Sequence, residues 1–254
     1  MVKEKIVPAA IRKRLPFPVK HPLLALAGWQ WRARGLPSQS PGDIAIFKSV
    51  LSSAGGQSLR VLEWGSGAST IYYARFLVSI GREFEWHAID NSRVWYERVQ
   101  GKTLQNNLAG RVRVHCSEFP AFWELPGYSP DSPVPPDSYT SSASILRYVE
   151  LPRELGANFD VVFVDGRFRR RCLLVAKEVL AHEGVVILHD AQRSHYHPSL
   201  SYYPHVQFLE TGVLPGSNAK STIALCSLDN ESFIYELANK YRSLPLASWQ
   251  AKRC

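Results

Sequence analysis

Residues 59–67 read Leu59-Arg60-Val61-Leu62-Glu63-Trp64-Gly65-Ser66-Gly67, and this stretch decides the fold. Its first six residues are mostly apolar and are as long as one buried strand. The two glycines then allow a sharp turn that brings backbone N–H groups close to a ligand. A helix is predicted to follow, with Ser69 or Thr70 as its N-cap and Gly81 at its end.

Strand-like and helical patterns alternate along the rest of the chain. Further strands of the parallel type are predicted at residues 84–89, 111–115, 159–164 and 185–188. Ser92 is predicted to cap a helix after the second strand. A later helix, stopping before Gly184, is predicted from the helical spacing of Cys172, Val175, Ala176, Val179 and Leu180. The alternation is typical of an α/β fold with a doubly wound, mostly parallel sheet.

Three details complete the predicted sheet. Residues 111–115 alternate strictly between polar and apolar, which favours an edge strand. Residues 205–210 and 221–228 flank the turn formed by residues 215–218, which predicts a C-terminal antiparallel hairpin. The sheet is therefore expected to have seven strands, with a last helix at residues 231–241.

The chain is expected to divide into a main domain with appendages. Residues 1–55 are interpreted as a basic N-terminal arm and a helix, residues 56–230 as the ligand-binding domain, and residues 231–254 as a C-terminal helix and tail. Within the domain, the proline-rich connection at residues 119–158 is expected to be a long loop insert. The arm is expected to rest on the domain or on a membrane surface.

The composition narrows the function classes. The chain has 254 residues, and Lys+Arg 30 against Asp+Glu 22 gives a net charge of +8. Such an excess favours an anionic partner: nucleic acid, a membrane surface or an acidic small molecule. The cysteines at positions 116, 172, 226 and 254 stand apart, which disfavours a zinc ribbon and a disulfide scaffold and predicts a cytoplasmic protein. No apolar run approaches the roughly 20 residues of a membrane span.

Acidic residues follow the predicted strands at the edge where ligands of such sheets bind. They are Glu63, Asp90, Asp165 and Asp190, the last preceded by His189. A single aspartate at such a place is usually a helix cap, but four at one edge predict a site. Dinucleotide-binding loops have a third glycine where this chain has Thr70, and no Lys-Ser/Thr pair follows the glycines as in a P-loop.

The stretch 61–67 resembles motif I of class I S-adenosylmethionine-dependent methyltransferases. Asp90 and the runs that end at Asp165 and Asp190 follow in the order of that superfamily, so the resemblance covers residues 56–228. The Glu-Trp-Gly-Ser-Gly form and the Asp-Gly-Arg and His-Asp strand ends are similar to bacterial sugar- or polysaccharide-type O-methyltransferases. They also partly resemble plant glucuronoxylan methyltransferases.

The resemblance implies S-adenosylmethionine as the cofactor and a role for each matched residue. Glu63 and the backbone of Gly65, Ser66 and Gly67 would hold its methionine part, and Asp90 would accept hydrogen bonds from both ribose hydroxyls. Cys116 and Ser117, with Glu118 beside them, would border the adenine, and Asp165 would lie at the reacting centre.

A general base would assist transfer of a methyl group to a hydroxyl. His189 is the first candidate and Asp165 the second; the alternative for His189 is a histidine that braces the strand end. Arg167 and Arg193 are predicted to contact the acceptor. The arginines at positions 169–171 are either a solvated face or an anion-binding edge.

Two metal options carry less weight. Asp165 and Asp190 match the places where catechol-type O-methyltransferases hold a divalent ion, but Ala191 follows where those enzymes have Asn. A second group suited to a transition metal is His189, Asp190, His195 and His197. Histidine-rich loops are more often only polar loops, so no metal is expected.

The leading prediction is methyl transfer to a hydroxyl of a small anionic or carbohydrate-like acceptor. Residues 165–168 lack the Asn/Asp-Pro-Pro-Tyr turn of nucleobase N-methyltransferases, which disfavours a nucleobase amine. Three alternatives remain: a methyltransferase acting on RNA, a catalytically inactive binding module of the same fold and, least favoured, a dehydrogenase. The sequence gives no prediction of the oligomeric state.

Overall fold

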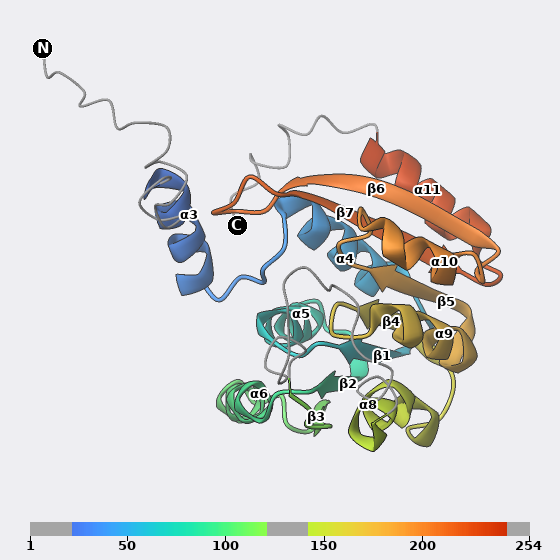
Figure 1. Cartoon of the computed structure of the whole chain (residues 1–254), viewed down its shortest axis with the longest axis horizontal. Coiled ribbons are helices and arrows are strands. Elements are labelled where there is room, and N and C mark those ends of the chain that lie inside the picture. Colours follow the sequence, from blue (N-terminus) through green and yellow to red (C-terminus); the bar gives the residue numbers. More distant parts are fainter. Residues whose placement is uncertain (1–21, 121–141, 243–254) are drawn as a thin grey trace, which may run out of the picture.

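A computed structural model describes residues 22–120 and 142–242. Its centre is a seven-stranded sheet with the order β3-β2-β1-β4-β5-β7-β6 (Figure 1). The strands are β1 Ser58–Trp64, β2 Glu83–Asp90, β3 Val112–Cys116, β4 Phe159–Val164, β5 Leu180–Leu188, β6 His205–Val213 and β7 Lys220–Ser227. Residues 1–21 of the basic arm, residues 121–141 of the proline-rich insert and residues 243–254 of the tail lie outside the described residues.

Helices cover both faces of the sheet. The described helices are α3 Pro22–Ala33, α4 Pro41–Ser53, α5 Ala68–Ser79, α6 Arg93–Gln105, α8 Ala143–Glu154, α9 Arg169–Val179, η2 Ser194–Tyr196, α10 His197–Leu200 and α11 Glu231–Arg242. Helices α4, α5, α6 and α11 pack into one buried cluster, and α8, α9 and α10 into the other. In β1, Val61 belongs to the first cluster and Leu62 to the second, which explains why the strand is apolar without alternation.

The predicted sheet is confirmed. Strands β1 to β5 pair in parallel, and the antiparallel strands β7 and β6 close the sheet. The alternating strand β3 lies at the edge, as expected. Ser92 caps α6 by accepting a hydrogen bond from the backbone N–H of Trp95. Among the described helices, none combines the length and the apolar character needed to cross a bilayer.

Two predicted boundaries are wrong. The N-cap of α5 is Gly67, not Ser69 or Thr70, because the hydroxyls of those two residues donate to Glu63 instead. The helix expected to run to Gly184 ends at Val179, and Gly184 lies inside β5. The sheet pairing that begins at Leu180 overrides the helical periodicity there.

Part of the proline-rich connection was wrongly predicted as loop. Its last third forms α8, which buries Ile145, Tyr148 and Val149 against the sheet. The indole N–H of Trp64 donates to the backbone oxygen of Tyr148 at 3.0 Å, so α8 is fixed to the end of β1. The prolines that precede α8 favoured a loop over its apolar spacing. Pro152 cannot donate to the backbone oxygen of Tyr148, and the indole of Trp64 supplies the missing donor.

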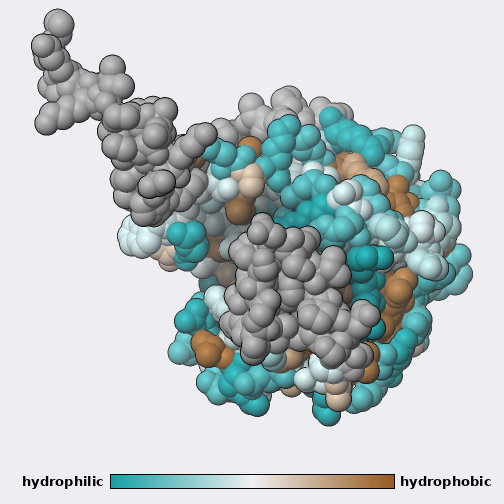
Figure 2. Space-filling model, in the orientation of Figure 1, coloured by the Kyte–Doolittle hydropathy of each residue, from teal (hydrophilic) through white to brown (hydrophobic). Residues whose placement is uncertain are grey.

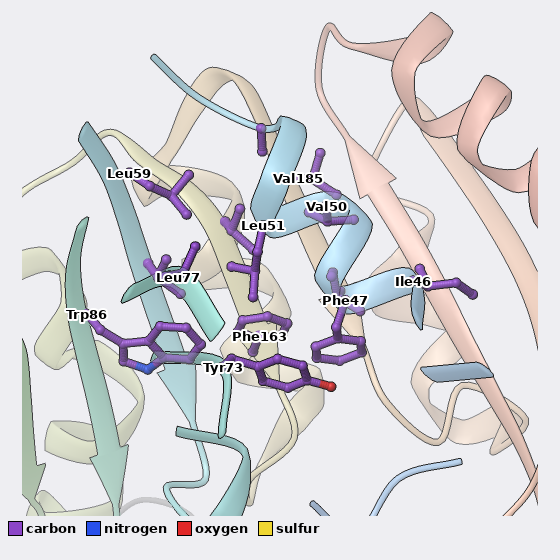
Figure 3. Close-up of a cluster of buried hydrophobic side chains, with 14 of the residues drawn as sticks. Ile46, Phe47, Val50, Leu51, Leu59, Tyr73, Leu77, Trp86, Phe163 and Val185 are labelled. Carbon is purple, nitrogen blue, oxygen red and sulfur yellow. The ribbon is translucent and has the colours of Figure 1, made fainter. Parts of the chain in front are cut away.

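Stacked aromatic rings form the centre of one core cluster (Figure 3). The ring of Phe163 on β4 stacks on those of Phe47 on α4 and Trp86 on β2, with centroid distances of 4.4 and 5.5 Å. Tyr73 on α5 stacks on Phe163 at 5.9 Å. Phe163 therefore joins two strands and two helices, and offset stacking adds to the free energy gained from burial.

Helix α4 is an integral part of this core, although it precedes the ligand-binding domain in sequence. Ser40 and Asp43 form a capping box, and Pro41 occupies the first turn. Asp43 is fully buried, and its carboxylate also accepts hydrogen bonds from Thr211 Oγ1 at 2.5 Å and Ser221 Oγ at 2.7 Å. The cap of α4 is thereby bound to β6 and β7.

Replacing Phe163 with Ala should destabilise the protein by about 3–5 kcal/mol, since a buried ring and three stacking contacts are lost. Urea unfolding followed by circular dichroism measures this. The matched control is Phe208→Ala, because the Phe208 side chain is 41% exposed and its loss should change stability by about 0.5 kcal/mol. Equal midpoints for the two variants would contradict the central position of Phe163.

Candidate functional site

A cavity of about 1240 Å³ lies at the carboxyl ends of β1, β2 and β4. The strand order reverses between β1 and β4, which is where sheets of this kind bind ligands. Of the predicted site residues, those that line the cavity are Gly65, Ser66, Gly67, Asp90, Glu118, Asp165 and Arg167. Those that do not are Glu63, Cys116, Ser117, His189 and Arg193.

The buried carboxyl group of Glu63 supports the glycine turn at residues 65–67. Glu63 is 2% exposed, and it accepts hydrogen bonds from Ser69 Oγ and Thr70 Oγ1, each at 2.6 Å, and from Trp86 Nε1 at 3.0 Å. Burial raises the pKa of Glu63 to about 7, against the opposing effect of these three donors. Glu63 therefore ties the first turn of α5 to the sheet beneath the cavity.

Gly65 allows this turn to approach the one after β4. It has a φ of +97°, and a Cβ atom there would lie 2.8 Å from the Cα atom of Gly166. A side chain at Gly166 would meet the hydroxyl of Tyr148 on α8. That hydroxyl accepts a hydrogen bond from the backbone N–H of Arg167 at 3.1 Å. The two turns that border the cavity are consequently packed backbone to backbone.

Asp90 presents its carboxylate to the cavity from the end of β2. Its Oδ2 accepts from Ser66 Oγ at 3.0 Å, and its Oδ1 accepts from the backbone N–H of Ser92 at 2.8 Å. Burial raises the pKa of Asp90 despite these hydrogen bonds. A carboxylate at the cavity wall can accept from two donors at once, so Asp90 is suited to a pair of adjacent hydroxyls.

Of the residues predicted to border the adenine, Glu118 lines the cavity, and Cys116 and Ser117 do not. Ser117 is buried and donates through Oγ to the backbone oxygen of Ser144 at 2.8 Å. Glu118 lines the cavity and pairs with Arg93 at 3.2 Å. Phe119 and Trp95 also line this end, and sequence reasoning missed both. The position of Phe119 just beyond the third strand was the available signal.

His189 lies between two carboxylates and not on the cavity surface. Its Nδ1 is 3.0 Å from Asp165 Oδ1, and its Nε2 is 3.4 Å from both Asp43 Oδ2 and Ser221 Oγ. Burial disfavours the charged ring, but the carboxylates of Asp165 and Asp43 outweigh it and raise the pKa of His189 to about 10. At neutral pH the ring is therefore an imidazolium that bridges α4 to the end of β4.

Arg169 also contacts the carboxylates that follow β4 and β5. Its side chain, 11% exposed, lies 2.9 Å from Asp165 Oδ1 and 3.3 Å from Asp190 Oδ2. Burial opposes the charged form of Asp165, but His189 and Arg169 together lower the pKa of its carboxyl group. Arg169 lines the cavity, but its guanidinium donates to Asp165, Asp190 and the backbone oxygens of Gly166 and His189, so it is neither a solvated surface side chain nor a free cation for an anion. Arg193 pairs with Asp190 at 2.8 Å and is half exposed.

The proposed metal ligands have other partners. Within residues 22–120 and 142–242, no group of three or more His, Cys, Asp or Glu side chains has the arrangement of a metal site. Asp165 and Asp190 share Arg169. The Nε2 atom of His197 lies 3.0 Å from the backbone oxygen of Ala191, and His195 packs against Tyr196.

The wall opposite the glycine turn comes from the linker between α3 and α4. Gly35, Leu36, Pro37, Ser38 and Gln39 all line the cavity. Gln39 is buried and accepts from the hydroxyl of Tyr73 at 2.5 Å, and Trp31 donates to the backbone oxygen of Pro37 at 2.6 Å. This wall was assigned to the N-terminal arm, because its sequence has no motif that marks a binding segment.

The fold is that of known methyltransferases. No family model matches the sequence, and no curated protein matches it. A methyltransferase-like protein from Silicibacter pomeroyi superposes with a TM-score of 0.53 at 16% identity, covering 82% of this chain and 97% of its own. An O-methyltransferase from Bacillus cereus, in complex with SAH, gives 0.50 at 16% identity, covering 86% and 97%. The Rossmann-like fold expected from motif I is confirmed.

The pKa of His189 predicts a pH-dependent stability. Its folded pKa of about 10 lies above 6.5, the ordinary value for histidine, so the stabilisation is complete below pH 6.5 and is lost as the pH rises through 10. His189→Asn should destabilise by about 3–5 kcal/mol at pH 6, because it leaves the buried carboxylate of Asp43 without an ion-pair partner, whereas Asp165 keeps Arg169. Urea unfolding at pH 6, 8 and 10 should show this difference shrinking.

The control is His182→Asn, since the side chain of His182 is 81% exposed. It should change stability little at any of these pH values. A difference between wild type and His189→Asn that stays constant from pH 6 to pH 10 would show that the ring is not charged in the folded protein.

Proposed function

We propose that the protein is an S-adenosylmethionine-dependent methyltransferase that methylates a hydroxyl of a small anionic or carbohydrate-like acceptor. One observation carries the proposal: the glycine turn, Asp90 and Asp165 line the same cavity, in the arrangement expected from motif I. The shared fold of the methyltransferases that superpose on the chain supports it. The alternative of an inactive module predicts no cofactor binding at all.

The residues of the cavity fit this cofactor. Asp90 presents a carboxylate that can accept from the two ribose hydroxyls, and Phe119 and Trp95 offer apolar surface to the adenine. Asp165 is an ionised carboxylate, suited to the positive charge of the methionine part. A Cβ atom at Gly67 would meet nothing within 4 Å, so the turn has room for a ligand. Glu63, 2% exposed, would act on the bound group through the turn and not by contact.

When bound, S-adenosylmethionine supplies an electrophilic methyl group for in-line displacement by the acceptor oxygen. The chain must align that oxygen and accept its proton. Asp165 Oδ1 is occupied by His189 and Arg169, whereas among the described residues Oδ2 has no hydrogen-bond or ion-pair partner. We therefore assign the proton of the acceptor hydroxyl to Oδ2 of Asp165.

His189 then has the second of its two predicted roles, that of a histidine that braces the strand end. A ring with a pKa of about 10 already carries its proton at neutral pH, so it is not poised to act as a base. Its contacts with Asp165 and Asp43 fix the orientation of the Asp165 carboxylate. We assign His189 to bracing Asp165, and Asp165 to the reacting centre.

The acceptor is expected to enter on the side of the cavity lined by Arg167 and Arg32. Both are cations at the cavity wall, which favours an acceptor with a carboxylate, phosphate or sulfate group. Arg193 faces Asp190 and does not line the cavity, so we give the acceptor contact to Arg167. The RNA alternative is less favoured, because Arg169, one of the three arginines that could contact RNA, is paired with Asp165 and Asp190.

Asp90→Asn should weaken S-adenosylmethionine binding at least about tenfold, because the amide nitrogen replaces one acceptor for the ribose hydroxyls. Titration calorimetry measures the affinity, with Asp229→Asn as the control at a carboxylate far from the cavity. Unchanged affinity in Asp90→Asn would remove the ribose assignment. NAD binding in place of S-adenosylmethionine would revive the dehydrogenase alternative.

Asp165→Asn should lower kcat by about 10²–10⁴-fold, the range of a general base, once an acceptor is found. A screen of hydroxylated carboxylates, sugars and sugar phosphates with labelled methyl identifies that acceptor. His189→Gln should lower kcat and move the acidic limb of the pH profile to higher pH, because the pKa of Asp165 rises once the imidazolium that lowers it is gone. If Asp165→Asn keeps wild-type kcat while His189→Gln abolishes pH dependence, the roles are reversed.

A further inference from the structure

A second cavity, of about 430 Å³, adjoins the candidate site. It is lined by the linker after α3 and by parts of α4, α5 and α6. Gly35, Ala68 and Lys102 line both cavities, so the two are neighbours. The site described above makes no use of this second cavity.

Four cations line this cavity, and no acidic residue does. They are Arg34 from the linker, Lys48 from α4, Arg75 from α5 and Lys102 from α6, and together they define what we call the cationic groove. Because the four belong to four separate elements, their convergence is a property of the tertiary structure. Gathering like charges is unfavourable unless a counter-charge is supplied.

The cations of the groove differ from most others on the protein. Basic side chains elsewhere are commonly paired with a carboxylate, as are Arg60, Arg93, Arg111, Arg113, Arg153 and Lys220. Across the described ranges 22–120 and 142–242, none of the four groove cations forms an ion pair. The groove is therefore a local excess of positive charge that the protein itself does not neutralise.

The ammonium of Lys48 is also held in place. Its Nζ lies 5.0 Å from the ring centroid of Tyr72 and 4.9 Å from that of Phe76. Both rings line the groove, and cation–π attraction orients the charge over them. Ser79, Gln105 and Asn106 add uncharged donors along the same wall.

We propose that the cationic groove is a binding site for a phosphate-class anion with two or more negative charges. Guanidinium groups bind phosphate oxygens in pairs, and the two lysines add point charges. The proposal does not depend on methyl transfer, because it concerns a separate cavity.

Two sources can supply such an anion: a soluble phosphorylated molecule or a phospholipid headgroup. Helix α3, which precedes Arg34 in the chain, has exposed apolar side chains that favour the phospholipid headgroup. Leu23, Leu26 and Trp29 are 80%, 50% and 62% exposed on the side of α3 turned away from Gly28, which packs against the turn of the β6–β7 hairpin. In Figure 2, by contrast, the apolar patches on the face shown are small and separated. The test therefore includes both sources.

The first arm titrates the full chain with inorganic pyrophosphate by calorimetry at low salt. The double variant Lys48→Ala/Arg75→Ala should bind it at least about tenfold more weakly, because two of the four cations are gone. Neither residue belongs to the candidate active site. The matched control is Arg147→Ala/Lys177→Ala, which also removes one Arg and one Lys, both exposed, from α8 and α9 on the other face of the sheet.

The second arm measures co-sedimentation with phosphatidylglycerol and phosphatidylcholine vesicles. Binding to the anionic vesicles alone that is lost in the groove variant, and kept in the control, assigns the anion to a lipid headgroup. Pyrophosphate binding with that same dependence, and no vesicle binding, assigns it to a soluble molecule. Equal weakening in the two double variants, or no binding of either probe by the wild type, overturns the proposal.

Folding of the variants is checked by thermal unfolding without ligand. Removing two repelling charges should offset the loss of the contacts of Lys48 with Tyr72 and Phe76, so the Tm of Lys48→Ala/Arg75→Ala should stay close to that of the wild type. Pyrophosphate should raise the Tm of the wild type and of the control, and raise that of the groove variant less, because only binding to the folded state stabilises it. An equal rise in all three proteins would likewise overturn the proposal.

Discussion

The site is organised around a buried imidazolium between two carboxylates. His189 contacts Asp165, which follows β4, and Asp43, which caps α4. Among the described residues, His189 is the only ion-pair partner of Asp43, so removing His189 would leave an uncompensated carboxylate in a low-dielectric interior, which is costlier than the interaction is favourable. The orientation of Asp165 at the cavity therefore depends on a helix cap that belongs to a different part of the chain.

The acidic and basic side chains of this basic protein are unevenly distributed. The carboxylates of Asp165 and Asp190 lie at the strand ends, where Arg169 and His189 compensate them from within. The net charge of +8 includes cations that the protein does not pair, and the cationic groove gathers four of them. The candidate cavity has both carboxylates and cations on its wall, whereas the neighbouring groove has cations and no carboxylate.

The sequence predicts those features that depend on local patterns. The glycine turn after β1, the edge position of β3 and the hairpin all follow from residues close together in the chain, and all agree with the structure. The pairing of Asp43 with His189 has no local signature, because a capping aspartate and a histidine after a strand each have a sufficient local explanation. The wall from Gly35 to Gln39 was missed for the same reason, since only tertiary packing brings it to the cavity.

The bracing also explains why a histidine in this position is compatible with chemistry at Asp165. A carboxylate that accepts a proton from an alcohol must be ionised beforehand, and the charges of His189 and Arg169 lower the pKa of Asp165. The same charges weaken it as a base, so proton transfer becomes favourable only as the methyl group moves and the oxygen becomes more acidic. Because two donors hold Oδ1, Oδ2 is the oxygen that would meet the acceptor in the proposed reaction. Alignment, rather than basicity, would then be the main contribution of the chain to that reaction.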